Sequence, residues 1–126
     1  MLTAEWDGKS EVVADEGELF ALLDRISRES REAPLLVDLV SPDGAVLSIG
    51  VGAPVTVLSF SQSPDGPYYS SRGQVEADEP SVWFSYNGAP TEFQRHKAID
   101  ADLAMRAASA FLSTGQRSSL VDWERV

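Results

Sequence analysis

Residues 35–51 read LLVDLVSPDGAVLSIGV. Two segments rich in β-branched and aliphatic residues, 35–40 and 45–51, flank Ser41-Pro42-Asp43-Gly44. Such segments favour strands. Proline presets φ for the second residue of a turn, and glycine accepts a positive φ at its end. The stretch therefore predicts two strands joined by a tight turn.

The same tetrapeptide recurs as Ser63-Pro64-Asp65-Gly66, between the strand-like residues 55–60 and 68–72. The sequences that flank the two tetrapeptides differ, so we interpret them as one turn used twice and not as a repeated domain. The second turn predicts that residues 68–72 pair back on residues 55–60.

A third turn, Asn87-Gly88, joins residues 81–86 to the short segment 91–93. Asn-Gly is the strongest short-range hairpin signal. Alternating residues also predict short strands at 2–6 and 118–124. The chain therefore reads as a meander of mainly antiparallel strands.

Two helices interrupt the meander. The first begins at Asp15, with Glu18 at capping-box spacing, and ends at Pro34. The second spans about 100–114, has a slim alanine-rich face and ends before Gly115. Hairpins and amphipathic helices together predict a single α+β domain over residues 1–126, with a mainly antiparallel sheet and both helices packed on one face.

Composition excludes several classes of protein. The chain has 126 residues, no cysteine, and 20 acidic against 10 basic side chains, a formal charge of −10. The lack of cysteine excludes disulfides, thiolate zinc sites and iron–sulfur clusters. The charge argues against nucleic acid or an anionic membrane as a direct partner. Without a visible signal peptide or a long apolar run, we expect a cytoplasmic protein without a cofactor.

The negative charge is localised. Residues 1–24 hold seven acidic side chains and one lysine, and residues 76–92 hold Glu76, Asp78, Glu79 and Glu92 with no basic side chain. One interpretation is solubility alone. The other is an electrostatic docking face for a cationic protein. The sequence leaves both interpretations open.

The candidates for chemistry do not assemble a reaction centre. His96 is the only histidine, and its polar, basic surroundings favour an exposed loop position. Asp122 and Glu124 alternate around Trp123, so both point to one side of the last strand. That pair could support acid–base chemistry or hold a metal, but an exposed strand face is the preferred interpretation. We therefore expect neither catalysis nor a metal site.

Two further side chains suggest binding. Asp38 shares a strand face with Leu36 and Val40, which indicates a hydrogen-bonded buried carboxylate or the rim of an interaction surface. If Phe84 and its face of residues 81–86 lie in the core, Trp83 is exposed. An exposed tryptophan beside an acidic segment is a candidate anchor for a protein partner.

Several short motifs match a known family pattern. They are Trp6, Leu47-Ser48-Ile49-Gly50, Pro67-Tyr68-Tyr69-Ser70-Ser71, Tyr86-Asn87-Gly88, Ser113-Thr114-Gly115-Gln116-Arg117 and Val121-Asp122-Trp123-Glu124. With them the chain resembles, over nearly its whole length, the first Imm family of immunity proteins from bacterial polymorphic toxin systems. Ser118 departs from the proline expected there.

The resemblance implies a non-enzymatic α+β protein that binds and neutralises a cognate toxin, often a nucleic-acid deaminase encoded next to it. It carries over no catalytic residues. We predict a basic toxin as partner of a monomer or weak dimer. The predicted partner-binding residues are Glu76, Asp78, Glu79, Trp83, Glu92, Asp122 and Glu124. The alternatives are a small ligand-binding or scaffolding domain, and an enzyme using Asp122, Glu124 or His96.

Overall fold

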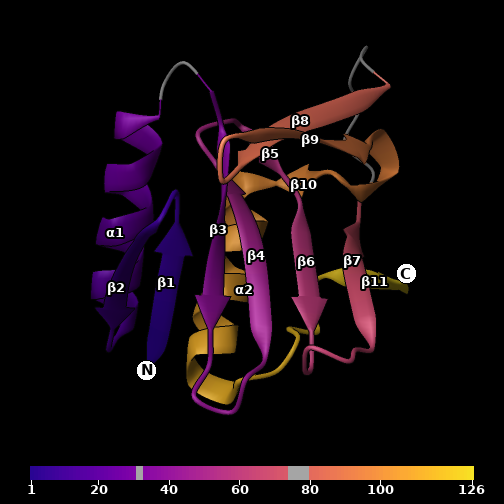
Figure 1. Cartoon of the computed structure of the whole chain (residues 1–126). Helices are drawn as coiled ribbons and strands as arrows, with labels where there is room; N and C mark the ends of the chain where they lie inside the picture. The colour runs from indigo at the N-terminus through magenta and orange to yellow at the C-terminus, as the bar shows by residue number, and fades with distance from the viewer. Residues whose placement is uncertain (31–32, 74–79) are drawn as a thin grey trace.

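The computed structural model describes residues 1–30, 33–73 and 80–126, and within them it confirms the α+β class. Its main sheet is largely antiparallel, and its principal path runs β11-β7-β6-β4-β3-β1-β2 (Figure 1). These strands are β1 (Leu2–Trp6), β2 (Lys9–Val13), β3 (Leu35–Val40), β4 (Val46–Val51), β6 (Leu58–Ser61), β7 (Tyr68–Arg72) and β11 (Asp122–Arg125).

Both Ser-Pro-Asp-Gly turns close in the same way. The backbone N–H of Gly44 donates to the carbonyl of Ser41 at 3.0 Å, and that of Gly66 donates to the carbonyl of Ser63 at 2.9 Å. The first turn joins β3 to β4, and the second joins β6 to β7. The predicted pairing of residues 68–72 with the preceding strand is confirmed.

Both helices begin where predicted and the second also ends there, whereas the first ends at Glu29, earlier than the predicted end at Pro34. Helix α1 (Glu16–Glu29) begins at Asp15, whose carboxylate accepts the N–H of Glu18 at 2.8 Å. Helix α2 (Ala101–Thr114) is capped by Asp100, and Gly115 follows with φ of 69°. A left-handed residue at this position satisfies a last helical carbonyl, and glycine adopts it without strain.

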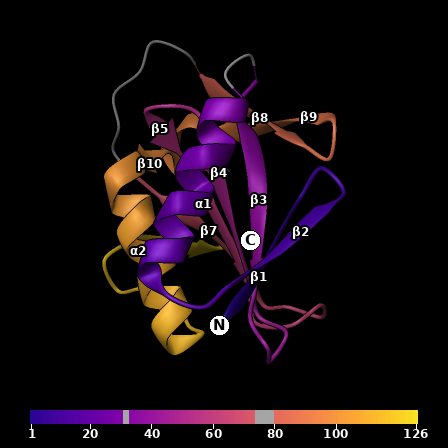
Figure 2. The same cartoon turned by 90° about the vertical axis from the view of Figure 1, so that its left-hand side faces the viewer.

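Both helices cover one face of the sheet, as predicted (Figure 2). Alternate residues of β3 and β4, including Val37, Leu39, Leu47 and Ile49, are buried against them. Phe111 of α2 packs edge-on against Phe60 of β6, with ring centroids 6.0 Å apart. Within the described residues, the opposite face of the main sheet carries no α-helix, only the short 3-10 helix Arg95–Lys97 near one end, and we call it the helix-free face.

The structure differs from the prediction in its short strands. The predicted strand 55–60 is divided into β5 (Val55–Thr56) and β6, and β5 pairs with β10 (Ile99–Asp100) in a separate small sheet. The sequence did not predict β2, which forms a hairpin with β1 across Asp7-Gly8.

The last strand begins later than residue 118, where the prediction was wrong. Ser118 is buried instead, and its side-chain oxygen accepts the N–H of Leu120 at 3.1 Å. Its carbonyl accepts the indole N–H of Trp123 at 2.9 Å. This departure from the family pattern therefore supports the turn into β11 locally.

A hairpin of β8 (Ser81–Tyr86) and β9 (Ala89–Gln94) lies across one end of the helix-free face (Figure 1). Its inner side, with Phe84 buried, packs on Leu36 and Val57 in a second small core. Gly50 makes this packing possible, because a Cβ there would lie 2.5 Å from Cε1 of Phe84 and 2.7 Å from Oγ1 of Thr56. Only glycine leaves room for that approach.

Candidate interaction face

A row of polar side chains crosses the helix-free face. Each member lies directly opposite the next on the neighbouring strand. Since directly opposite residues point to the same face, the row is continuous from one edge strand to the other. Its members, here called the polar row, are Ser10, Glu5, Asp38, Ser48, Ser59, Ser70 and Glu124.

Asp38 lies half-buried within the polar row and is held by two donors. One carboxylate oxygen accepts the hydroxyl of Ser48, and the other accepts the hydroxyl of Tyr86 at 2.7 Å. This hydrogen bond, with burial and the negative charges of Asp38 and Glu5, raises the pKa of Tyr86 to about 12. Asp38 is thus a hydrogen-bonded carboxylate, as one interpretation of the sequence predicted. It also lies at the edge of an open polar face, as the other interpretation predicted.

The far end of the polar row has a different electrostatic character. Glu124 accepts a hydrogen bond from Nε2 of His96 at 2.7 Å, and Ser70 Oγ lies 3.4 Å from the same oxygen. The hydrogen bond with His96 lowers the pKa of Glu124, with smaller effects from the charges of His96, Lys97 and Arg72. Here a carboxylate is surrounded by basic groups.

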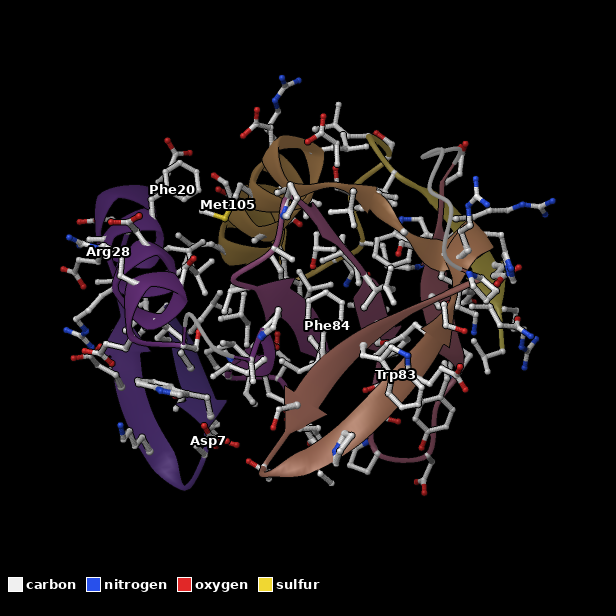
Figure 3. The ribbon with its side chains drawn as sticks, turned by 90° about the horizontal axis from the view of Figure 1, so that it is seen from above. Asp7, Phe20, Arg28, Trp83, Phe84 and Met105 are labelled. Atoms are coloured by element: carbon white, nitrogen blue, oxygen red, sulfur yellow. The ribbon has the colours of Figure 1, made fainter. Side chains whose placement is uncertain are left out.

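A cleft opens between two hairpin tips at the acidic end of the polar row. The tips are Asp7-Gly8 and Asn87-Gly88, and the N–H of Asp7 donates to Oδ1 of Asn87 at 3.1 Å. Figure 3 shows Asp7 at the tip of its hairpin. The cleft measures about 770 Å³, and its lining includes Glu5, Asp7, Asp38 and Tyr86. It therefore joins three carboxylates to an aromatic ring.

A second hollow, of about 430 Å³, lies over β4, β6 and β7 on the same face. Small side chains such as Ser48, Ser59 and Ser61 line it, with Tyr68 and Phe93 at its sides. Ser48 is the hydrogen-bond partner of Asp38, which lines the cleft. The two hollows therefore adjoin at this pair.

Trp83 is exposed, as the strand alternation predicted. Its fractional exposure is 55%, whereas that of the adjacent Phe84 is 2%. In Figure 3, Phe84 is turned toward the interior of the molecule. Glu92 lies directly opposite Trp83 on β9, and both are exposed. The outer side of the hairpin thus presents an aromatic side chain beside a carboxylate.

The other predicted partner-binding residues lie elsewhere. Asp122 and Glu124 share one side of β11, opposite Arg72 and Ser70 of β7. Glu76, Asp78 and Glu79 lie outside the described residues. In the structure, Trp83 therefore lies beside Glu92, and Asp122 lies on the same side of β11 as Glu124. Glu124 also lies beside His96.

Sequence reasoning missed the cleft. Its acidic side chains come from β1, the β1–β2 tip and β3, which only the folded sheet brings together. One signal was present, because Asp7-Gly8 is the same kind of hairpin dipeptide as Asn87-Gly88.

The described residues contain no group of three or more histidine and carboxylate side chains placed to hold a metal ion. In that same part of the chain, neither helix has the length and apolarity to cross a membrane.

These features define a class, a small α+β protein with one open, polar sheet face. The chain belongs to the Imm1 family, because the family model described as Immunity protein Imm1 matches residues 7–125. Membership makes it an immunity protein, directed against a toxin. No curated protein matches the chain significantly.

Proposed function

We propose that this protein binds a cognate toxin of a bacterial polymorphic toxin system and neutralises it by covering the active site or substrate groove. The observation that carries this proposal is the family match over residues 7–125. Inhibition comes from binding alone, without catalysis by the immunity protein. Its place of action is the cytoplasm, where the toxin would meet its target.

The charge of the chain supports a toxin that acts on nucleic acid, such as a nucleic-acid deaminase. An enzyme that binds the phosphate backbone needs clustered lysine and arginine side chains. A protein with a formal charge of −10 is attracted to such a groove from a distance. That attraction accelerates association and disfavours nucleic acid as a competitor.

Two of the proposed contacts, Trp83 and Glu92, lie on the outer side of the β8–β9 hairpin. Trp83 is the anchor, since tryptophan dominates the energetics of protein interfaces. Glu92 adds negative charge beside it. Glu76, Asp78 and Glu79, proposed from the sequence alone, extend the acidic segment, and Asp122 and Glu124 contribute from the last strand.

Size-exclusion chromatography of the purified protein with the toxin encoded by the adjacent gene tests the proposal. We expect one 1:1 complex and loss of toxin activity in the same fractions. Separate elution of the two proteins at micromolar concentration would remove the proposed function. A thermal shift with a small metabolite, in the absence of any complex, would favour a ligand-binding domain instead.

A further inference from the structure

We infer that the toxin docks on the helix-free face, and that a lysine or arginine side chain of the toxin enters the cleft between the Asp7-Gly8 and Asn87-Gly88 tips. This inference rests on the proposed function and adds the helix-free face and its cleft to the contacts proposed there. Four features of the face support it.

The first feature is the distribution of compensated charge. On the helical side, Asp24 pairs with Arg28 at 2.9 Å and Glu11 pairs with Arg25 at 2.8 Å. Within the described residues, no ion pair engages Glu5, Asp7 or Asp38. The lining of the cleft also includes Lys9, so three carboxylates stand against one ammonium group and the cleft keeps a net negative charge for an external cation. Two acids beside α1, in contrast, are paired with basic side chains of that helix.

The second feature is the shape of the face. The centre of the polar row consists of serines, whose short side chains leave the sheet surface low between larger neighbours. The second hollow continues the cleft across the Asp38–Ser48 pair. A segment of the toxin lying along the polar row would fill both hollows and find hydroxyl groups along its length.

The third feature is the chemistry at the acidic end. Tyr86 is 40% exposed and lines the cleft beside Glu5 and Asp38. Carboxylates bind ammonium and guanidinium groups through charge-assisted hydrogen bonds, and a tyrosine ring adds attraction for a cation. Lysine and arginine are the side chains that match this lining.

The fourth feature is that the cleft is formed before binding. The Asp7–Asn87 hydrogen bond fixes one tip against the other, and Ser48 and Tyr86 fix the carboxylate of Asp38. A preformed site loses less conformational entropy on association, so more of the interaction energy appears as affinity.

Stopped-flow association of the toxin with two matched double variants tests the inference. Glu5→Gln with Asp7→Asn removes two charges from the cleft while keeping side-chain size, and Asn tolerates the positive φ of 46° at position 7. Asp24→Asn with Glu16→Gln removes two exposed charges from α1, at positions that line neither the cleft nor the second hollow. Both variants have the same net charge. A difference between their association rates therefore shows which part of the surface the toxin approaches.

We expect the cleft variant to associate roughly three- to tenfold more slowly than the wild type at low salt, and the α1 variant to change by less than about twofold. Equal slowing in both variants, or slowing in the α1 variant alone, would overturn the docking surface while leaving the proposed function intact. A wild-type protein that forms no complex would overturn the proposed function and this inference with it.

Discussion

The backbone N–H of Asp7 donates a 3.1 Å hydrogen bond to Oδ1 of Asn87, and it joins two hairpin tips that lie 80 residues apart in the chain. Both tips carry positive φ at both turn residues, 46° and 75° at Asp7 and Gly8, and 49° and 86° at Asn87 and Gly88. Positive φ at both positions is the requirement of a type I′ turn. Two tight turns of one kind therefore fix the mouth of the cleft.

Replacing Asn87 tests this junction. Asn87→Ala loses the acceptor and forces a Cβ residue without a polar side chain into the left-handed region, whereas Asn87→Gly loses only the acceptor. We expect the alanine variant to be less stable than the glycine variant by about 1 kcal/mol. Urea unfolding followed by tryptophan fluorescence measures the difference. Equal stabilities would show that the turn conformation is not the one described.

Gly50→Ala tests the packing of the β8–β9 hairpin on the sheet. The new Cβ would collide with Phe84 and Thr56, and we expect a loss of about 1–3 kcal/mol of unfolding free energy. Gly17→Ala in the first turn of α1 is the control, because its Cβ meets Asp15 at an ordinary 3.4 Å. That variant should gain up to about 1 kcal/mol. A tolerated Gly50→Ala would contradict the close approach of Phe84.

Tyr86 gives the stability a pH dependence in alkali. Its pKa is about 12 in the fold against 10.0 ordinarily, so the unfolded chain loses the phenolic proton first. The stabilisation is complete below pH 10 and is lost as the pH rises toward 12. We expect the stability difference between wild type and Tyr86→Phe to be constant up to pH 10 and to shrink above it. The difference between the tyrosinate absorbance of the two proteins should report one tyrosine with a pKa of about 12, and a difference centred near pH 10 would exclude the hydrogen bond.

Trp83→Ala tests the anchor on the hairpin. We expect a loss of about 2 kcal/mol of toxin binding free energy, roughly 30-fold in Kd, with little change in stability because the side chain is exposed. Leu120→Ala is the control, since Leu120, in the turn before β11, is 54% exposed and Trp83, on β8, is 55% exposed. Isothermal titration calorimetry measures both. Equal affinities for the two variants would place the anchor elsewhere.

The sequence was sufficient to predict features that depend on residues adjacent in the chain. The two Ser-Pro-Asp-Gly turns, the caps at Asp15 and Gly115, and the exposure of Trp83 each depend on local chemistry or on strand alternation. These features give the fold class directly, because hairpins and amphipathic helices permit few arrangements.

The sequence was not sufficient where residues distant in the chain meet. The strand order that places Glu5 beside Asp38 depends on β1 joining β3, and no local pattern specifies that partner. The division of residues 55–60 into two strands follows from the pairing of β5 with β10. Strand β10 lies some 40 residues further along the chain than β5. The sequence did not predict that the serines of the polar row form one line across the sheet, for the same reason. Only the pairing register of the strands aligns them.

Co-expression with the adjacent toxin gene measures directly whether this protein neutralises the toxin. Cells that express the toxin alone should stop growing, and cells that also express this protein should grow as cells without the toxin do. We expect rescue by the wild type, and weaker rescue by Trp83→Ala made in equal amount. Continued growth arrest in cells that contain the wild-type protein in excess over the toxin would contradict the proposed function.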